Sequence, residues 1–562
     1  MSSIRKLLSA LLLVPAAFAE DVLISRRHDL HQKRSGYGNF EISIYHINDV
    51  HAHLDQFSSS GTDCTRPERG CFGGYSRVKT VLNSTRPSKE NSLFLNAGDE
   101  FQGTLFYNFY KGWRTADTLN QLGVNAMTLG NHEFDGGDDE LAAFINNITF
   151  PILAANLKST NPTLNSSVKP YVIFEQYDMA VIGVITPETS RLSNPGNGTT
   201  FTDPVVAVQA AVDEIKATTD INRIVALTHI GYTEDIKLAE QTTGLSLIIG
   251  GHSHTPLGNI TGSQGSYPTI ANNTAGEEVF IVTAYRWGEY LGYIDLVYDT
   301  AGRVLEYRGA PIHLTNQTRQ DPALQAQVDA WREPFQEFAN EVVGESAVEL
   351  VQETCQAEEC TLGDLMADAI VAYRPEADLA IINAGGVRAS IDVGPITRGE
   401  ILTSFPFGNA IVELTLSGQQ VWDVLEGTVS HVNQASGRAV TSFLQISSGL
   451  RIVYDPAGQV GSRLANVTVK DAPIDLAGSY QVATLDYLAG GGDNFFEATT
   501  DYITLDLQAD VLLAYLASVN PVEIALDGRI STVQPSTRVR RRMLSGLLVF
   551  RVAVQVAGVS DT

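Results

Sequence analysis

The sequence predicts a two-domain α/β protein in which helices cover the sheets, and three observations support this fold class. Short apolar runs typical of core strands alternate with helical patterns through the first half of the chain. Polar clusters directly follow several of these runs, as expected where loops at strand ends form an active site. A charged, glycine-free stretch at residues 317–341 is typical of a helical connector, and it separates this half from a second half that mixes helices and strands.

The first domain is expected at residues 40–316. Its core strands are predicted at the apolar runs Ile42–Ile47, Leu93–Leu95, Ala126–Leu129, Ile152–Ala154, Val181–Ile185, Ile224–Leu227, Leu247–Ile249 and Val279–Thr283. Between two of these runs, Pro204–Thr218 has apolar residues at helical spacing and predicts an amphipathic helix. Strands that alternate with helices favour a layered α/β domain.

The second domain is expected at residues 342–533. A helix is predicted at Leu362–Tyr373, and a strand that enters a glycine-rich turn is predicted at Leu379–Arg388. Segments rich in β-forming residues, such as Phe443–Tyr454, follow. This half of the chain is therefore expected to be a separate, mixed α/β domain.

The composition is that of an acidic globular protein. Of the 562 residues, 44% are hydrophobic and 18% are charged, and the formal net charge is −26. This charge argues against a nucleic-acid partner, because nucleic acids are bound by broad basic surfaces. A small molecule that bears phosphate remains compatible, provided that metal ions and a few arginines reverse the local sign of the charge.

Residues 1–19 are typical of a secretory signal peptide. The basic pair Arg5-Lys6 precedes the apolar stretch Leu7–Val14, and Ala17-Phe18-Ala19 forms a small-residue cleavage site. The apolar stretch is too short to span a bilayer. In the N-terminal segment 20–39 that follows, Lys33-Arg34 is either a second processing site or an exposed charge pair.

Glycosylation and cysteine patterns agree with secretion. Asn-X-Ser/Thr sequons occur at Asn83, Asn147, Asn165, Asn197, Asn259, Asn272, Asn316 and Asn466. The 4 cysteines form two close pairs, and local pairing closes the smallest loops in an oxidising compartment. We therefore predict the disulfides Cys64–Cys71 and Cys355–Cys360.

The tail at residues 534–562 begins with basic residues and becomes largely apolar after Arg540-Arg541-Arg542. It matches a lipid-anchor signal poorly, because Arg551 and Gln555 interrupt the apolar stretch. A disordered or tag-like end is favoured, and attachment to a membrane through a C-terminal lipid anchor is the alternative.

Five polar clusters follow strand-like runs in the first domain, and they contain the residue types that bind divalent metals. These clusters are Asn48–His53, Gly98–Glu100, Gly130–Asp135, Thr228-His229 and Gly250–His254. Asp49 and His51 are separated by one residue, so they project to the same side of an extended backbone. Carboxylate, imidazole and amide groups together suit two transition ions better than calcium or magnesium. Each cluster alone could be a polar turn, but five in equivalent positions favour a metal centre.

The clusters also resemble the motifs of a known family. In order, Asn-Asp-Val-His, Gly-Asp-Glu, Gly-Asn-His-Glu-Phe-Asp, Thr-His and Gly-His-Ser-His resemble those of the dinuclear calcineurin-like metallophosphoesterases, and more narrowly those of the secreted 5′-nucleotidases. The resemblance covers roughly Phe40–Val533. It implies a four-layer αββα metal domain, a separate mixed α/β substrate-binding domain, and two divalent metal ions. Zinc is the first candidate for these ions, and manganese or cobalt are the alternatives.

The same resemblance implies a role for each residue of the clusters. One ion would be held by Asp49, His51, Asp99 and His254, and the other by Asp99, Asn131, His229 and His252, with Asp99 as the bridge. His132 would act on the transition-state oxygens or the leaving group, and Asp135 would orient its ring. His46, His53 and Glu133 are expected to have structural or supporting roles.

Three segments of the second domain resemble nucleoside-binding motifs of the family. Taken alone, Phe407 and Tyr487 would be ordinary core residues, but two aromatics in glycine-rich turns can also sandwich a planar base. The resemblance implies these substrate contacts: Phe407 and Tyr487 for the base, Asn409 for the base edge, Asp493 for ribose hydroxyls, and Asn383 and Arg388 for phosphate. At Gln356, between the second pair of cysteines, the family has an arginine that helps to hold phosphate, so one phosphate contact is expected to be missing here.

The expected function is the metal-dependent release of phosphate from nucleoside 5′-monophosphates. Nucleoside di- or triphosphates, UDP-sugars and 2′,3′-cyclic nucleotides are alternative substrates, because the same metal centre can serve several phosphoesters. A catalytically silent secreted protein that binds nucleotides is an alternative of another class.

Overall fold

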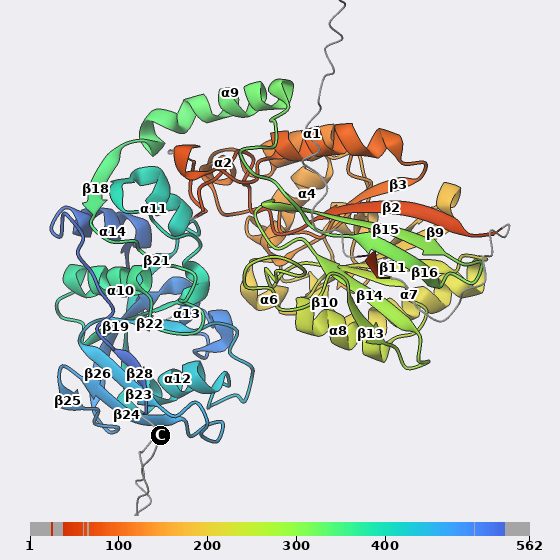
Figure 1. Ribbon diagram of the computed structural model, residues 1–562. Coiled ribbons are helices and arrows are strands. Elements are labelled where there is room, and N and C mark those ends of the chain that lie inside the picture. Colours follow the sequence, from red (N-terminus) through yellow and green to blue (C-terminus); the bar gives the residue numbers. More distant parts are fainter. Residues whose placement is uncertain (1–23, 26–37, 60, 65–66, 500, 534–562) are drawn as a thin grey trace, which may run out of the picture.

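The computed structural model describes residues 24–25, 38–59, 61–64, 67–499 and 501–533. It has two domains, and helix α9 (Pro322–Ala339) runs from one to the other (Figure 1). The predicted signal peptide, the Lys33-Arg34 pair and the tail at residues 534–562 lie outside the described residues. Within the described part of the chain, no helix has both the length and the apolar character needed to cross a membrane.

The first domain is built on two large sheets. The strands of the first sheet are β1 (Ile24–Ser25), β2 (Phe40–Ile47), β3 (Ser92–Asn96), β4 (Ala126–Thr128), β5 (Ile152–Leu153), β7 (Val168–Lys169), β15 (Tyr290–Tyr298), β16 (Val304–Gly309) and β17 (Ile312–His313). Their order is β1-β16-β15-β2-β3-β4-β5-β7, and β17 pairs with β15. The strands of the second sheet are β8 (Tyr171–Phe174), β9 (Met179–Ile185), β11 (Arg223–His229), β12 (Leu247–Gly250), β13 (Thr269–Asn272) and β14 (Glu278–Thr283). Their order is β13-β14-β12-β11-β9-β8.

Helices cover the outer face of each sheet. The helices of this domain are α1 (Tyr75–Thr85), α2 (Leu105–Tyr110), α3 (Trp113–Leu122), α4 (Gly137–Ile145), α5 (Pro162–Ser167), α6 (Thr189–Leu192), α7 (Pro204–Thr218) and α8 (Tyr232–Gln241). Ile44 of β2 and Val181 of β9 belong to one core cluster between the two sheets. Phe94, on the other face of the first sheet, clusters with Leu119 of α3. The second sheet packs its outer face against α7 and α8. The four-layer αββα arrangement is therefore confirmed.

Parallel pairing determines where the polar clusters meet. In the first sheet β2, β3, β4 and β5 are parallel, and in the second β9, β11, β12 and β14 are parallel. The carboxyl ends of parallel strands lie at one edge of a sheet. The five predicted clusters lie at the carboxyl ends of β2, β3, β4, β11 and β12 or in the loops that follow them, with Thr228-His229 as the last two residues of β11, so they converge.

The second domain has a core of its own. Its strands are β18 (Val342–Ser346), β19 (Leu379–Asn383), β20 (Gly394–Thr397), β21 (Ala410–Ser417), β22 (Leu444–Ile446), β23 (Leu450–Tyr454), β24 (Leu464–Val469), β25 (Ala472–Pro473), β26 (Ser479–Leu485), β27 (Ile503–Leu507) and β28 (Ile530–Thr532). A five-stranded sheet has the order β22-β19-β26-β21-β27, a four-stranded sheet has the order β25-β24-β23-β28, and β18 pairs with β20. The helices are α10 (Thr361–Tyr373), α11 (Arg398–Ser404), α12 (Gly418–Ser430), α13 (Asp486–Ala489) and α14 (Gln508–Leu516).

Both predicted disulfides, Cys64–Cys71 and Cys355–Cys360, are present. A buried glutamine holds the second disulfide loop from inside the domain. Gln445 Nε2 donates to the carbonyls of Cys355 and Glu358, both at 2.8 Å, and its Oε1 accepts from the backbone N–H of Cys360 at 3.0 Å. The loop that includes Gln356 is therefore fixed to the core of the domain.

Candidate metal centre and substrate site

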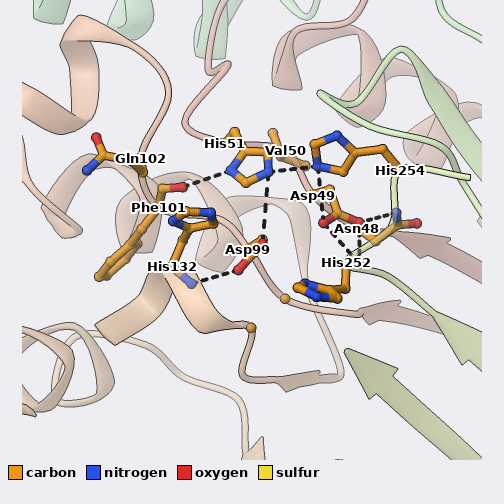
Figure 2. Close-up of polar contacts among 12 residues, drawn as sticks. Asn48, Asp49, Val50, His51, Asp99, Phe101, Gln102, His132, His252 and His254 are labelled. Atoms are coloured by element: carbon orange, nitrogen blue, oxygen red, sulfur yellow. Dashed lines mark hydrogen bonds and ion pairs between the residues drawn. The ribbon is translucent and has the colours of Figure 1, made fainter. Parts of the chain in front are cut away.

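The predicted metal-binding side chains gather at the edge where the strands end. Figure 2 shows the side chains of Asp49, His51, Asp99, His252 and His254, from the loops after β2, β3 and β12, gathered in one place. One group of potential ligand atoms comes from Asp49, His51 and His254, and another comes from Asp99, His229 and His252; within each group these atoms lie within 4.8 Å of one another. The structure thus brings together the two sets of carboxylates and imidazoles that the sequence assigned to two ions.

Asp99 lies between the two groups. Its Oδ2 is 3.0 Å from His229 Nε2 on one side and 3.9 Å from His51 Nε2 on the other. Burial alone would raise the pKa of Asp99, but the imidazoles of His229 and His132 hold it well below its usual range. The carboxylate therefore stays ionised, as the predicted bridging role requires.

Histidine ring orientation is fixed by bonds to backbone carbonyls. His229 Nδ1 lies 2.7 Å from the carbonyl oxygen of Ala97, and His51 Nδ1 lies 3.2 Å from that of Phe101. In each ring the Nε2 atom is consequently left facing the centre, which is the usual arrangement in metal sites. Burial alone would lower the pKa of His229, but the carboxylates of Asp99 and Asp49 raise it to about 10.

The neutral ligand predicted for the centre is also suitably placed. Asn131 is buried at the start of the 3-10 turn Asn131–Phe134, and its Oδ1 has no hydrogen-bond partner among the described residues. A buried carbonyl oxygen without a partner is costly unless a ligand satisfies it. The donor set of carboxylates, imidazoles and an amide oxygen therefore fits divalent transition ions.

Five of these residues have backbone conformations that are unusual outside glycine. The φ angles are 51° at Asp49, 49° at His51, 57° at Asp99, 84° at His252 and 47° at His254. Each such residue costs on the order of 1–3 kcal/mol and persists only where its surroundings enforce it. Their concentration in three loops indicates a site whose geometry is maintained at the expense of stability.

Backbone hydrogen bonds hold these loops together. The N–H of Asp49 donates to the carbonyl of Gly98, and the N–H of His51 donates to that of Asp99. Glu133 is fully buried, and its carboxylate accepts from the N–H groups of Gly130, Asp99, Glu100 and Phe101 at 2.6, 3.0, 2.7 and 3.2 Å. A side chain at Gly130 would overlap Asp99 Oδ1, so glycine is required there.

His132 and Asp135 form the expected pair. His132 Nδ1 lies 2.8 Å from Asp135 Oδ2, and the backbone N–H of His132 donates to Asp99 Oδ1 at 2.9 Å. Burial alone would lower the pKa of His132, but Asp135 and Asp99 raise it above its usual value. The imidazole is therefore well suited to hold a proton next to the ligand cluster.

Two residues of the second domain reach the metal centre. Arg388 Nη2 lies 3.2 Å from His51 Nε2. The ring of Phe407, in the turn between α11 and β21, stacks on that of His132, with centroids 5.6 Å apart and planes 23° apart. Two substrate residues predicted from the second half of the chain thus contact a predicted metal ligand, His51, and the predicted catalytic residue His132.

The other predicted substrate residues surround a buried carboxylate. Asp493 accepts from Asn383 Nδ2 at 2.7 Å, from Thr441 Oγ1 at 2.8 Å and from the Tyr487 hydroxyl at 3.3 Å. Asn409 is half-buried two residues beyond Phe407, and its backbone carbonyl accepts from the N–H of Gln508.

Comparisons with known proteins agree with this geometry. The profile of the calcineurin-like phosphoesterases matches residues 42–256, and that of the 5′-nucleotidase C-terminal domain matches residues 342–501. The chain is 34% identical to snake venom 5′-nucleotidase of Naja atra, over 88% of this chain and 99% of that protein. It is 32% identical to the 5′-nucleotidase of Homo sapiens, over 88% of this chain and 91% of that protein. The chain belongs to the 5′-nucleotidase family.

A solved structure supports the same assignment for both domains. The 5′-nucleotidase precursor of Thermus thermophilus superposes with a TM-score of 0.82 at 35% identity, covering 88% of this chain and 100% of that one. The predicted family and enzyme class, a metallophosphoesterase that acts as a phosphoric monoester hydrolase, are confirmed. Membership of the calcineurin-like phosphoesterases also implies that the enzyme uses divalent metal ions.

In this 5′-nucleotidase-family chain, the histidines expected to be structural lie beside the centre. His46 is buried, its Nε2 lies 2.8 Å from the Tyr267 hydroxyl, and burial lowers its pKa to about 3. His53 has both ring nitrogens 2.9 Å from backbone carbonyls and stacks on Trp287. Neither ring is in the groups of potential metal ligands found among the described residues.

Sequence reasoning missed several residues of the site. Ser193 Oγ donates to Asp135 Oδ1 at 2.6 Å and Gln102 Nε2 donates to Asp135 Oδ2 at 3.3 Å, so both help to hold the His132–Asp135 pair. No pattern in the sequence indicated Ser193. The loop 284–288 after β14 also contacts the centre, and a signal was available for it, because it follows the predicted strand Val279–Thr283.

Proposed function

We propose that the protein hydrolyses nucleoside 5′-monophosphates, with release of phosphate and the nucleoside. The observation that supports this most directly is the contact between domains, in which Arg388 meets His51 and Phe407 meets His132. A nucleotide has an anionic end that needs metals and arginine and a planar end that needs aromatic stacking. Here Arg388 and the predicted metal ligands suit the anionic end, and Phe407 beside them suits the planar end.

In this proposal, the seven predicted ligands bind two divalent ions. Asp49, His51, Asp99 and His254 hold one ion, and Asp99, Asn131, His229 and His252 hold the other. Zinc is the first candidate because imidazole and carboxylate ligands suit it, with manganese and cobalt as alternatives. When bound, the two ions supply water activation and charge neutralisation at the phosphoryl group.

The protein's own side chains orient the substrate and supply a proton. Asp135 occupies His132 Nδ1, so the opposite ring nitrogen is the one available to donate to the leaving oxygen. Arg388 binds phosphoryl oxygens, with Asn383 on the same side of the substrate. Phe407 and Tyr487 hold the base, Asn409 lies near its edge, and Asp493 accepts from ribose hydroxyls.

The proposed setting is extracellular. The signal peptide, the sequons and the two disulfides all favour a secreted glycoprotein. A nucleotide is the proposed partner, and no nucleic acid is expected to bind so acidic a protein.

A substrate panel tests the proposal. Phosphate release would be measured from AMP, ADP, ATP, UDP-glucose and 2′,3′-cyclic AMP at equal concentrations. We expect the highest kcat/KM for AMP. A preference for ATP or UDP-glucose would overturn the proposed substrate, and binding of AMP without release of phosphate would overturn the proposed reaction.

A further inference from the structure

The loop after β14 is tied to the first metal-binding turn. Asn48 Nδ2 donates to the carbonyl of Tyr285 at 2.8 Å, and Asn48 Oδ1 accepts from the N–H of Ala284 at 2.8 Å. The N–H of Trp287 donates to the carbonyl of Asp49 at 2.6 Å. These bonds fix the backbone on both sides of Arg286 against the turn that carries Asp49.

Tyr285 and Trp287, the residues that flank Arg286, are held in a costly conformation. Their φ angles are 67° and 59°, in a region that aromatic residues rarely adopt. The loop thus resembles the metal-binding loops, since it follows a parallel strand of the second sheet and keeps an unfavourable backbone conformation. Its central residue, Arg286, is a cation.

The guanidinium of Arg286 packs on aromatic rings and has no counter-ion among the described residues. Its central carbon lies 3.8 Å from the centroid of Trp287 and 5.1 Å from that of Tyr285. Its Nε is buried without a hydrogen-bond partner, and it forms no ion pair with any residue that the structure describes. A half-buried cation of this kind is costly unless an anion binds beside it.

A second arginine approaches from the other domain, and among the described residues it forms no ion pair with a carboxylate. Arg388 Nη2 lies 3.2 Å from His51 Nε2, and Arg388 donates to the carbonyl of Gly385 at 3.4 Å. His51 is two residues beyond Asp49, whose carbonyl accepts from the N–H of Trp287 in the Arg286 loop. Both arginines are therefore held beside the same metal-binding turn.

We propose that Arg286 and Arg388 form a two-sided oxyanion site that takes the terminal phosphoryl group of the substrate and the phosphate product. This inference rests on the proposed function and adds a specificity residue from the first domain. Neither arginine forms an ion pair among the described residues, so an anion that binds beside both would satisfy two otherwise unpaired charges. Planar guanidinium forks suit phosphoryl oxygens on two sides.

The neutral side chain of Gln356 is consistent with phosphoryl binding by one arginine from each domain. Gln356 Oε1 accepts from Ser442 Oγ at 3.3 Å, and Ser442 Oγ accepts from the N–H of Gly385 at 2.9 Å. Gln356 therefore lies beside the turn that leads to Arg388 without adding charge. The first domain supplies the second cation through Arg286.

Two cations at one phosphoryl group should favour a substrate whose phosphoryl group has two negative charges over one whose group has a single charge. A phosphate monoester has up to two negative charges on its terminal group, and a phosphodiester has one. Loss of Arg286 should therefore reduce kcat/KM for AMP more than kcat/KM for 2′,3′-cyclic AMP. Equal losses for both substrates would contradict the preference for a dianion.

Binding of inorganic phosphate tests the site without catalysis. Calorimetric titration of zinc-loaded protein would compare the wild type with Arg286→Gln, Arg286→Lys and the control Arg308→Gln, which changes an exposed residue of β16. We expect about 10- to 100-fold weaker binding in Arg286→Gln, since the variant loses charge-assisted hydrogen bonds to the phosphate oxygens. Arg286→Lys should have intermediate affinity, and Arg308→Gln should match the wild type. Wild-type affinity in Arg286→Gln would overturn the proposal.

The fluorescence of Trp287, whose ring packs against Arg286, gives a second measurement. This measurement does not depend on the folding of an Arg286 variant. Phosphate added to the wild type should change the emission of Trp287, and the change should be absent in Trp287→Phe. An emission unaffected by saturating phosphate would overturn the site. Wild-type protein that binds phosphate but does not hydrolyse AMP would refute the proposed function and leave the oxyanion site standing.

Discussion

The imidazole of His132 in the first domain stacks on the phenyl ring of Phe407 in the second, with centroids 5.6 Å apart and planes 23° apart. His132 is the proposed proton donor, and Phe407 is one of the proposed base-stacking residues. The residue proposed to recognise the base and the residue proposed to act at the phosphate are thus in direct contact. Substitution of Phe407 should consequently affect mainly KM, and substitution of His132 should affect mainly kcat.

Phe407→Ala should raise KM for AMP by about 5- to 150-fold, because stacking on an aromatic side chain contributes about 1–3 kcal/mol per base. The KM for p-nitrophenyl phosphate, which has no nucleobase, should change much less. Steady-state kinetics with both substrates would measure the difference. An equal effect on both would show that Phe407 serves the metal centre rather than the base.

His132→Ala should lower kcat for AMP by about 10²- to 10⁴-fold, the usual contribution of a general acid. The matched control is His431→Asn, which alters an exposed histidine after α12. Metal content of both variants would be determined together with kcat. If His132→Ala retained most of its turnover with both ions bound, another group would have to be the proton donor.

Asp99→Asn should reduce the bound metal from two ions to less than one per chain, because Asp99 Oδ2 faces ligands of both groups. The substitution removes the negative charge that a bridging position requires. Elemental analysis after dialysis would measure the ratio of metal to protein, with Asp299→Asn, at a half-buried position after β15, as the control. Two ions retained in Asp99→Asn would contradict the bridging role.

Asp364→Asn should make the second domain more stable than that of the wild type, and this gain in stability should increase as pH rises. Asp364 is fully buried on α10, and its carboxylate lies 3.5 Å from Arg529 Nε. Burial raises the pKa of Asp364 to about 8, although the charge of Arg529 opposes the shift. Because the folded protein holds this proton more tightly than the unfolded chain, stability is lost as pH rises from about 4 to about 8.

Thermal unfolding at pH 5 and pH 8 would measure this effect. The Tm of Asp364→Asn minus that of the wild type should be more positive at pH 8 than at pH 5. The matched control is Asp423→Asn, at a half-buried position of α12, measured at the same two pH values. A pH-independent difference for Asp364→Asn would mean that its carboxyl group does not titrate in this range.

The sequence predicted the fold and most of the ligand cluster because both follow local rules. The strand-like runs form strands, the helix predicted at Pro204–Thr218 has those bounds, and parallel pairing brings the loop residues to one edge. Asp49 and His51 were recognisable because their residue types are metal ligands and a strand precedes them. The domain boundaries at 316 and 342 stay predictions.

The rest depended on tertiary structure. Arg286 follows a predicted strand, but a lone arginine has no pattern that distinguishes a surface charge from a site residue. Ser193 is 58 residues from Asp135 in the sequence, so only the folded chain brings its hydroxyl to that carboxylate. The stacking of Phe407 on His132 likewise depends on how the second domain is placed against the first.

The most direct test of the central claim is phosphate release from AMP by protein that has been stripped with a chelator and then titrated with zinc. We expect no release from the stripped protein and full recovery of kcat as the ratio of zinc to protein approaches two. Undiminished release from metal-free protein, or no release at any ratio of zinc, manganese or cobalt, would contradict a dinuclear metal-dependent nucleotidase.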